Sequence, residues 1–331
     1  MEYKGKYYKT FDNDNFILVR EMNKGEKYKD FLTIDKNTGK LYITKIIEKN
    51  DILDGEKISK QINLLGDFKE NIAYLFNIKK THNNNYFIIE YFNGGNFKKF
   101  QNIYINENKS QLNERFIRKA INQIISQIKF MHKKKELYRN IKLENIFINF
   151  DMYVNKIRNG ELPPKINFSK IQLDNEPFTL KFGNFFHFQY IANSENLEVQ
   201  SFMPPEMAQR CKAGENINTI IDKKSDIWSI GALTYELLTG KKLFEGNNSE
   251  ETYNNIINGK YSFPNNLKVS KEIISFIIEL LQYYPEKRLS FENIRYLDFI
   301  EKDFDDFNFI DLSVKQNTEI DSKKPNMSLI E

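Results

Sequence analysis

The chain has 331 residues, of which 40% are hydrophobic and 28 are Phe, so it can bury a sizeable core in one large domain or two modest ones. It carries 49 Lys and Arg against 45 Asp and Glu, and a net charge of +4 is too slight to indicate nucleic-acid binding. A single cysteine, Cys211, excludes an internal disulfide framework. The start MEYKGKYYKT lacks the apolar core of a signal peptide, and no apolar run reaches the roughly 18 residues that cross a bilayer. We therefore expect an intracellular protein of the cytoplasm or the nucleus.

The first ninety residues are predicted to be rich in strands. Residues 15–48 alternate and turn as strands do, and KNTGK at 36–40 is typical of a hairpin turn. EKISKQINLLGDF at 56–68 places its apolar residues on one face and predicts a helix. IAYLFNIKK at 72–80 and YFIIEYF at 86–92 then predict two more strands.

After NGGN at 93–96 the apolar pattern takes the helical period. LNERFIRKAINQIISQIKFMH at 112–132 has one apolar stripe and predicts a long amphipathic helix. Further helices are predicted at 225–239, 249–258, 270–282 and 290–300. The expected fold is therefore α+β, with a small β-rich lobe that carries one main helix and precedes a larger helical lobe.

We divide the chain into an N-terminal lead at 1–15, the two lobes at 16–92 and 93–300, and an acidic tail at 301–331. The tail has eight acidic and four basic side chains, a net of −4, so residues 1–300 carry +8. That difference would let the tail dock on a basic surface, but the sequence favours a solvated, disordered end. An insertion at about 151–178 is either a partner-binding element or a tolerated surface expansion, and both interpretations stay open.

Three motifs of the helical part resemble those of the eukaryotic protein kinases. KSDIWSIGALTYELLTGKKLFEG at 224–246 resembles the segment in which an aspartate, here Asp226, caps and anchors the central helix. SFMPPE stands where the alanine-proline-glutamate motif ends the activation segment, and YYPEKRLS supplies Arg288 as the partner of that glutamate, Glu206. The resemblance covers roughly residues 16–300 and implies a two-lobed kinase fold.

ELYRNIKLENIFIN at 136–149 resembles the kinase catalytic loop, with one departure. Lys142 and Asn145 match the family, and a lysine two residues past the catalytic base marks the serine/threonine branch. Asn140 stands where the family has an aspartate that orients the substrate hydroxyl and accepts its proton. An amide cannot accept that proton, and loss of a general base typically costs roughly 10²- to 10⁴-fold in rate.

The metal site that the resemblance implies is also altered. TLKFGNFFHF at 179–188 matches the aspartate-phenylalanine-glycine motif, so Asn184 replaces the magnesium-binding aspartate. Magnesium prefers carboxylate oxygen, and Asn145 and Asn184 offer none. We expect no metal site and no required cofactor; ATP and magnesium would be the cofactors of an active kinase.

The β-rich lobe departs from the family in its phosphate-binding parts. Lys45 in LYITKII matches the lysine that pairs with ATP phosphates, whereas Gln61 stands at the helix glutamate with which that lysine pairs. In NKGEKYKD at 23–30 only Gly25 remains of the three loop glycines that let backbone N–H groups approach phosphate. Tyr28 and Asp30 replace the third glycine and the following valine.

The adenine pocket implied by the resemblance is lined by larger side chains. Ile43 replaces a small alanine of the family, and Phe147 replaces a leucine. Ile89, Lys45 and Gly25 complete the degenerate pocket. We expect these apolar groups to fill the space of adenine, although a small shift would let them tolerate ATP.

The departures favour a pseudokinase that acts as a scaffold or allosteric regulator and holds a protein partner. The alternative is a weak or atypical serine/threonine kinase that retains Lys45, Lys142 and Asn145 and transfers the γ-phosphate of ATP to protein. Transfer of another nucleotide group on the same scaffold is a third class, and it would still need a metal.

Overall fold

The structure is a computed structural model of the chain. It describes residues 2–3, 6–7, 9–11, 15–24, 28–48, 72–133, 141–151, 166–183, 202–215, 222–314 and 318–323. The chain forms two compact units. The first consists of Met1–Phe100, Ile146–Ile171 and Glu176–Phe186, and the second of Gln101–Asn145, Gln172–Asn175 and His187–Glu331. Among the described helices, none is long and apolar enough to cross a membrane.

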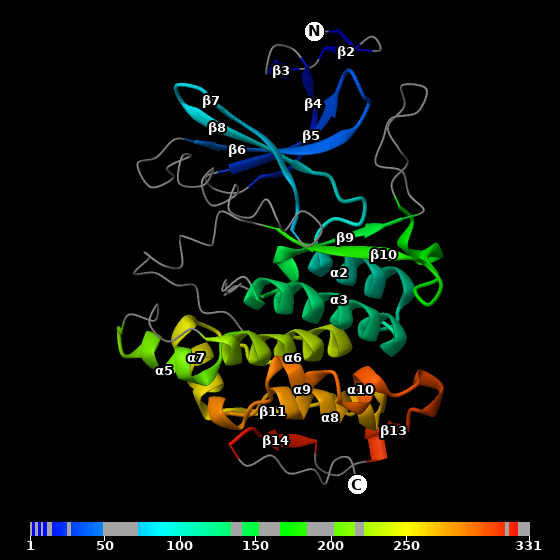
Figure 1. Ribbon diagram of the computed structural model, residues 1–331, viewed down its shortest axis with the longest axis vertical. Coiled ribbons are helices and arrows are strands. Elements are labelled where there is room, and N and C mark those ends of the chain that lie inside the picture. Colours follow the sequence, from blue (N-terminus) through cyan, green and yellow to red (C-terminus); the bar gives the residue numbers. More distant parts are fainter. Residues whose placement is uncertain are drawn as a thin grey trace. The chain divides into compact units, whose positions relative to one another are not determined.

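Six strands of the first unit form one antiparallel sheet in the order β3-β4-β5-β6-β8-β7 (Figure 1). Their bounds are Lys9–Phe11 for β3, Phe16–Lys24 for β4, Tyr28–Asp35 for β5, Leu41–Glu48 for β6, Leu75–Lys80 for β7 and Asn84–Glu90 for β8. A short pair, β1 (Glu2–Tyr3) and β2 (Lys6–Tyr7), precedes them. The strands predicted at 15–48, 72–80 and 86–92 are therefore present, whereas the helix predicted at 56–68 lies outside the described residues.

The turn between β5 and β6 follows from its sequence. The Asp35 carboxylate accepts hydrogen bonds from the backbone N–H of Asn37 at 2.9 Å and from the Thr38 hydroxyl at 2.6 Å. Gly39 has a φ of 68°, a conformation that glycine adopts without steric cost. The hairpin turn predicted at 36–40 is confirmed, and it fixes the register in which β5 and β6 pair.

A second hairpin of this unit pairs β9 (Ile146–Phe150) with β10 (Phe178–Phe182). Phe178 lies opposite Phe150, so the segment assigned to the insertion is the connection between the two strands of this hairpin. Within that segment the described residue Phe168 is buried, and its ring lies 5.3 Å from that of Phe100. Part of the insertion thus packs in the core of the first unit, and a partner-binding role for it stays a prediction.

The second unit is mainly helical. Its longer helices are α2 (Phe97–Asn108, which begins in the first unit), α3 (Glu114–Lys133), α5 (Pro205–Lys212), α6 (Lys223–Thr239), α7 (Ser249–Asn258) and α8 (Lys271–Leu280). The helices predicted at 112–132, 225–239, 249–258 and 270–282 are confirmed, while α2 and α5 were not predicted. The helical segment predicted at 290–300 is present as two short helices, α9 (Phe291–Ile294) and α10 (Asp298–Glu301), which are separated by a turn.

Helix α6 is buried along almost its whole length and packs against both α3 and α8 (Figure 1). The prediction that Asp226 caps it is wrong. Its N-cap is Asp222, whose carboxylate accepts hydrogen bonds from the backbone N–H groups of Lys224 at 2.7 Å and Ser225 at 3.2 Å. Asp226 lies one turn further on, inside the helix, where its carboxylate is free to bond another element.

The described part of the acidic tail docks on the second unit, in contrast to the solvated end that the sequence favoured. Strand β13 (Phe309–Asp311) pairs with β12 (Lys268–Ser270), and β14 (Glu319–Asp321) pairs with β11 (Lys260–Ser262). Arg115 of α3 contacts the Asp305 carboxylate at 2.9 Å and lies 4.6 Å from the Phe304 ring. Backbone pairing and aromatic contacts, in addition to charge, hold the tail.

Candidate functional site

Lys45 is the candidate phosphate-binding residue of the first unit, and a neighbouring strand already supplies its counter-charge. Asp30 on β5 and Lys45 on β6 are directly opposite in the antiparallel register. Their charged groups approach to 2.8 Å, and each side chain is 16% exposed. The ion pair is therefore largely buried within the sheet unit.

Tyr28 adds a second contact to the same ammonium group. Residues 28 and 30 of one strand point to the same face, and the Lys45 ammonium lies 3.7 Å from the centroid of the Tyr28 ring. Burial lowers the pKa of Lys45, and the nearby Asp30 carboxylate opposes that shift. The lysine thus has an anionic and an aromatic partner at positions where the kinase resemblance implies a valine and a glycine.

Ile43 and Ile89 face each other across β6 and β8. Ile43 packs against the buried cluster that includes Leu32 and Ile34, and Ile89 packs against Ile47 and Phe87. Both side chains are half-buried, as expected for apolar residues that belong to the sheet packing. The sheet thus brings two of the predicted pocket residues to adjacent positions.

Phe147, on β9, packs against its own hairpin. Its ring centroid lies 5.3 Å from that of Phe92. A Cβ atom added to Gly183, just after β10, would lie only 2.4 Å from the Phe147 Cε2 atom. The ring therefore occupies space that only a glycine at position 183 leaves open.

The catalytic-loop residues that the structure describes belong to the second unit. Lys142 precedes the short 3₁₀ helix η2 (Leu143–Asn145), Asn145 ends it, and the Asn145 N–H donates to the Lys142 carbonyl at 3.0 Å. Asn145 is buried, and Lys142 is half-buried. The remaining candidate positions, Gly25, Gln61, Asn140 and Asn184, lie outside the described residues, so their predicted roles stay predictions.

The structural motifs of the helical unit are intact. Glu206 and Arg288 form the predicted pair with two hydrogen bonds, of 2.8 and 2.6 Å. The Arg288 side chain is fully buried, donates to the carbonyl oxygens of Gln282 and Tyr283, and lies 5.0 Å from the Trp228 ring. This bidentate pair fixes the region after the activation segment on the helical core.

Asp226 anchors α6 through a buried contact with α3. Its Oδ2 atom lies 2.7 Å from Nε2 of His132, and both side chains are less than 5% exposed. The predicted anchoring role is thus confirmed, although the capping role belongs to Asp222.

These features agree with comparisons to known proteins. The protein kinase domain family matches residues 16–300. The chain belongs to the protein kinase family. It is 27% identical to the probable serine/threonine protein kinase IRE4 of Arabidopsis thaliana, over 83% of this chain and 26% of that protein.

Two further relatives are serine/threonine-protein kinase Nek5 of Homo sapiens and Aurora kinase C of Mus musculus. Nek5 is 28% identical over 87% of this chain and 37% of its own length. Aurora kinase C is 25% identical over 86% of this chain and 91% of its own length. The chain thus spans less than half the length of several curated relatives that it matches. A crystal structure of Rad53 in complex with AMP-PNP superposes with a TM-score of 0.60 and 21% identity, over 87% of this chain and 66% of that one. This likeness confirms the two-lobed kinase fold.

Sequence reasoning missed two features of this kinase-family chain. It placed Asp30 at the position of the family valine but did not pair it with Lys45, because the pairing depends on the strand register. It also gave Gly183 no role, although a small residue directly before Asn184 and a bulky Phe147 could have signalled a close approach.

Proposed function

We propose that this chain is a protein-kinase-like module that transfers phosphate poorly or not at all and acts by binding a protein partner, as a scaffold or allosteric regulator in signalling. The Lys45–Asp30 ion pair is the observation that carries the proposal. Family members that transfer phosphate use ATP and magnesium, and the lysine at this position serves the ATP phosphates. Here a fixed carboxylate at 2.8 Å takes that place and would repel an incoming phosphate.

Two aromatic side chains of the sheet unit support the same proposal, because they take space that a nucleotide would need. The Tyr28 ring lies against the Lys45 ammonium, and the Phe147 ring lies against Gly183. Both rings occupy positions that the resemblance assigns to smaller residues. We infer that these residues do not fit MgATP as they stand, and we derive no catalytic step through it.

The retained residues Lys142 and Asn145 favour a second candidate, a weak serine/threonine kinase. This candidate requires that Lys45 exchange Asp30 for a phosphate. It also requires that the reaction proceed with Asn140 and Asn184 in place of the two aspartates of the family. The loss of rate that follows the loss of a general base argues against this candidate.

Direct nucleotide binding separates the two candidates. We expect calorimetric titration of the full chain with ATP, with and without magnesium, to show no micromolar affinity. Asp30→Val, which restores the family residue and frees Lys45, is expected to gain nucleotide affinity, and Asp30→Val with Lys45→Met to lose that gain. Micromolar MgATP affinity in the unmodified chain would contradict the proposal.

A phosphoryl-transfer assay tests the catalytic part separately. We expect Asn140→Asp with Asn184→Asp to stay inactive on generic serine/threonine substrates, because Asp30 still holds Lys45 and catalysis in this family depends on positioning. Adding Asp30→Val to the double variant tests whether the Lys45–Asp30 ion pair is what still prevents phosphoryl transfer. Activity of the unmodified chain that disappears in Lys45→Met would establish the weak-kinase alternative.

A further inference from the structure

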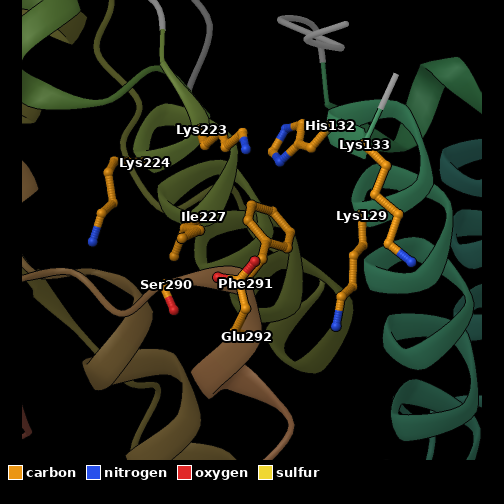
Figure 2. A pocket seen from close by; sticks show the side chains of 9 residues that line it. All are labelled: Lys129, His132, Lys133, Lys223, Lys224, Ile227, Ser290, Phe291 and Glu292. Atoms are coloured by element: carbon orange, nitrogen blue, oxygen red, sulfur yellow. The ribbon is translucent and has the colours of Figure 1, made fainter. Parts of the chain in front are cut away.

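A cavity in the helical unit, away from Lys45 in the sequence and in a different unit, has a lysine-rich lining. It measures about 150 Å³ and lies among the end of α3, the start of α6 and the start of α9 (Figure 2). Its lining consists of Lys129, His132, Lys133, Lys223, Lys224, Ile227, Ser290, Phe291 and Glu292. Four of these nine residues are lysines, and one is acidic.

Three of the lysines donate no hydrogen bond and form no ion pair within the described part of the chain. Lys129 and Lys133 are four residues apart on α3 and therefore share one face of that helix. Lys223 begins α6, and Figure 2 shows the three side chains around the ring of Phe291. Lys224 differs, because its ammonium bonds the carbonyl oxygens of Arg288 and Leu289.

Glu292 is the one acidic side chain in the lining, and it does not balance the lysines. Hydrogen bonds from its own backbone and from Ser290 hold the pKa of Glu292 below its usual range, and Lys129 and Lys223 lower it further. It is therefore ionised at neutral pH. Four lysines against one carboxylate leave the lining with a formal charge of about +3, which favours an anion.

The floor of the cavity is apolar and rigid. Ile227 is fully buried within α6, and the Phe291 ring packs edge-on against His132 with centroids 4.6 Å apart. His132 is itself held by Asp226 at 2.7 Å. The exposed lining of the cavity as a whole is mostly apolar, so a ligand that carries a few carbon atoms behind its anionic group would contact apolar surface there.

We propose that this cavity binds a phosphate monoester on the phosphorylated side chain of a partner protein segment. A cavity of about 150 Å³ is smaller than the roughly 300–1,000 Å³ typical of sites for whole small molecules, so it suits one side-chain end and not a nucleotide. Lysine ammonium groups bind phosphate as point charges, and phosphate carries close to two negative charges at neutral pH. The proposal stands independently of whether the chain transfers phosphate.

The test is calorimetric titration of the full chain at low and physiological salt. The probes are inorganic phosphate, a blocked pentapeptide Ala-Ala-phosphothreonine-Ala-Ala and the same peptide without phosphate. We expect the phosphopeptide to bind more tightly than inorganic phosphate, because its carbon atoms contact the apolar part of the cavity lining, and we expect the plain peptide not to bind. Binding is expected to weaken as salt rises.

Variants assign the binding to this cavity. Lys129→Met with Lys223→Met is expected to weaken phosphopeptide binding at least tenfold. Lys241→Met is the matched control, because it removes one exposed lysine just beyond the other end of α6, and it should leave affinity unchanged. Glu292→Gln is expected to tighten binding severalfold, since it removes the competing carboxylate.

The Glu292→Gln result keeps the proposal falsifiable even if the double lysine variant does not fold, which a thermal melt would reveal. Equal affinity in all variants would overturn the proposal. Binding of inorganic phosphate with no preference for the phosphopeptide would also overturn it, because the cavity would then hold an adventitious ion only.

Discussion

The ion pairs of the helical unit and of the sheet unit differ in how they relate to the family pattern. In the helical unit, Glu206 and Arg288 pair as the kinase resemblance implies, and the arginine is fully buried. In the sheet unit, Lys45 pairs instead with Asp30, a residue that stands where the family has an apolar side chain. Interactions that hold the fold are kept, while the residue that serves phosphate is occupied. The two units thus differ in which part of the family pattern they keep, and the proposed function rests on that difference.

The largest effect is expected in the helical unit, when the carboxylate partner of Arg288 is removed. Glu206→Gln leaves a buried guanidinium without its carboxylate, and we expect the free energy of unfolding to fall by about 3 kcal/mol. Chemical denaturation measures it. Glu245→Gln is the matched control, because Glu245 pairs with Lys242 on the exposed surface and should contribute less than about 0.5 kcal/mol. A loss below about 1 kcal/mol for Glu206→Gln would contradict the assigned role.

Steric replacement tests the sheet side. Gly183→Ala places a Cβ 2.4 Å from the Phe147 ring, and we expect it to lower the free energy of unfolding by about 2 kcal/mol through overpacking. Phe147→Leu should relieve most of that loss when the two changes are combined. A double-mutant cycle measures the coupling, and additive effects would show that the two residues do not compete for the same space.

The sequence predicted the fold and the scaffold pairs better than the site, for physical reasons. Long amphipathic segments such as 112–132 reveal helices through their period, and Glu206 and Arg288 belong to motifs of fixed order. The cap of α6 was misassigned because Asp222 and Asp226 are both acidic and near its start, and only the backbone geometry decides which accepts the first N–H groups.

The local environment of Lys45 was not predictable for a different reason. Its neighbour Asp30 lies 15 positions earlier, and a shift of the strand register by one residue would turn the two side chains to opposite faces. The docked tail was missed because short strands such as 309–311 have no periodicity of their own and form only by pairing with β12.

Removing the counter-charge of Lys45 sharpens the comparison further. Asp30→Asn is expected to cost about 1–2 kcal/mol of unfolding free energy, less than a fully buried pair because both side chains are 16% exposed. Burial lowers the pKa of Lys45, so without Asp30 it should fall further below 10.5. The cost is therefore present in full at a pH below the folded pKa of Lys45 in the variant, and it disappears as the pH rises through the folded pKa of Lys45 in the unmodified chain.

Denaturation of this variant between neutral pH and pH about 10 measures the trend. Lys45→Met is the reference background, in which Asp30→Asn should have little effect of either sign. A deficit that grows with pH would mean that Asp30 does not act through the charge of Lys45.

The smallest expected effect extends the comparison to the docked tail. The Glu272 carboxylate of α8 accepts from the Asn308 N–H at 2.9 Å, from the Asn308 side-chain amide at 3.0 Å and from Lys302 at 3.0 Å. Burial acts to raise the pKa of Glu272, but these hydrogen bonds together outweigh it, so the pKa lies below its usual value of 4.5. A lowered folded pKa contributes stability above pH 4.5 that is lost as the pH falls through the folded value.

We expect Glu272→Gln to lower the free energy of unfolding by about 1 kcal/mol at neutral pH, because the amide replaces charge-assisted hydrogen bonds with weaker ones. The difference from the unmodified chain should vanish in acid, once Glu272 is protonated in both folded and unfolded states. Lys302→Met should cost less, since the lysine is 34% exposed and its charge is partly screened by solvent. Denaturation curves of the variants and the unmodified chain at neutral pH and below pH about 4 measure these differences in the free energy of unfolding. A deficit independent of pH would place the origin of the effect in packing, and the tail would then be held by its strands and aromatic contacts without a contribution from this carboxylate.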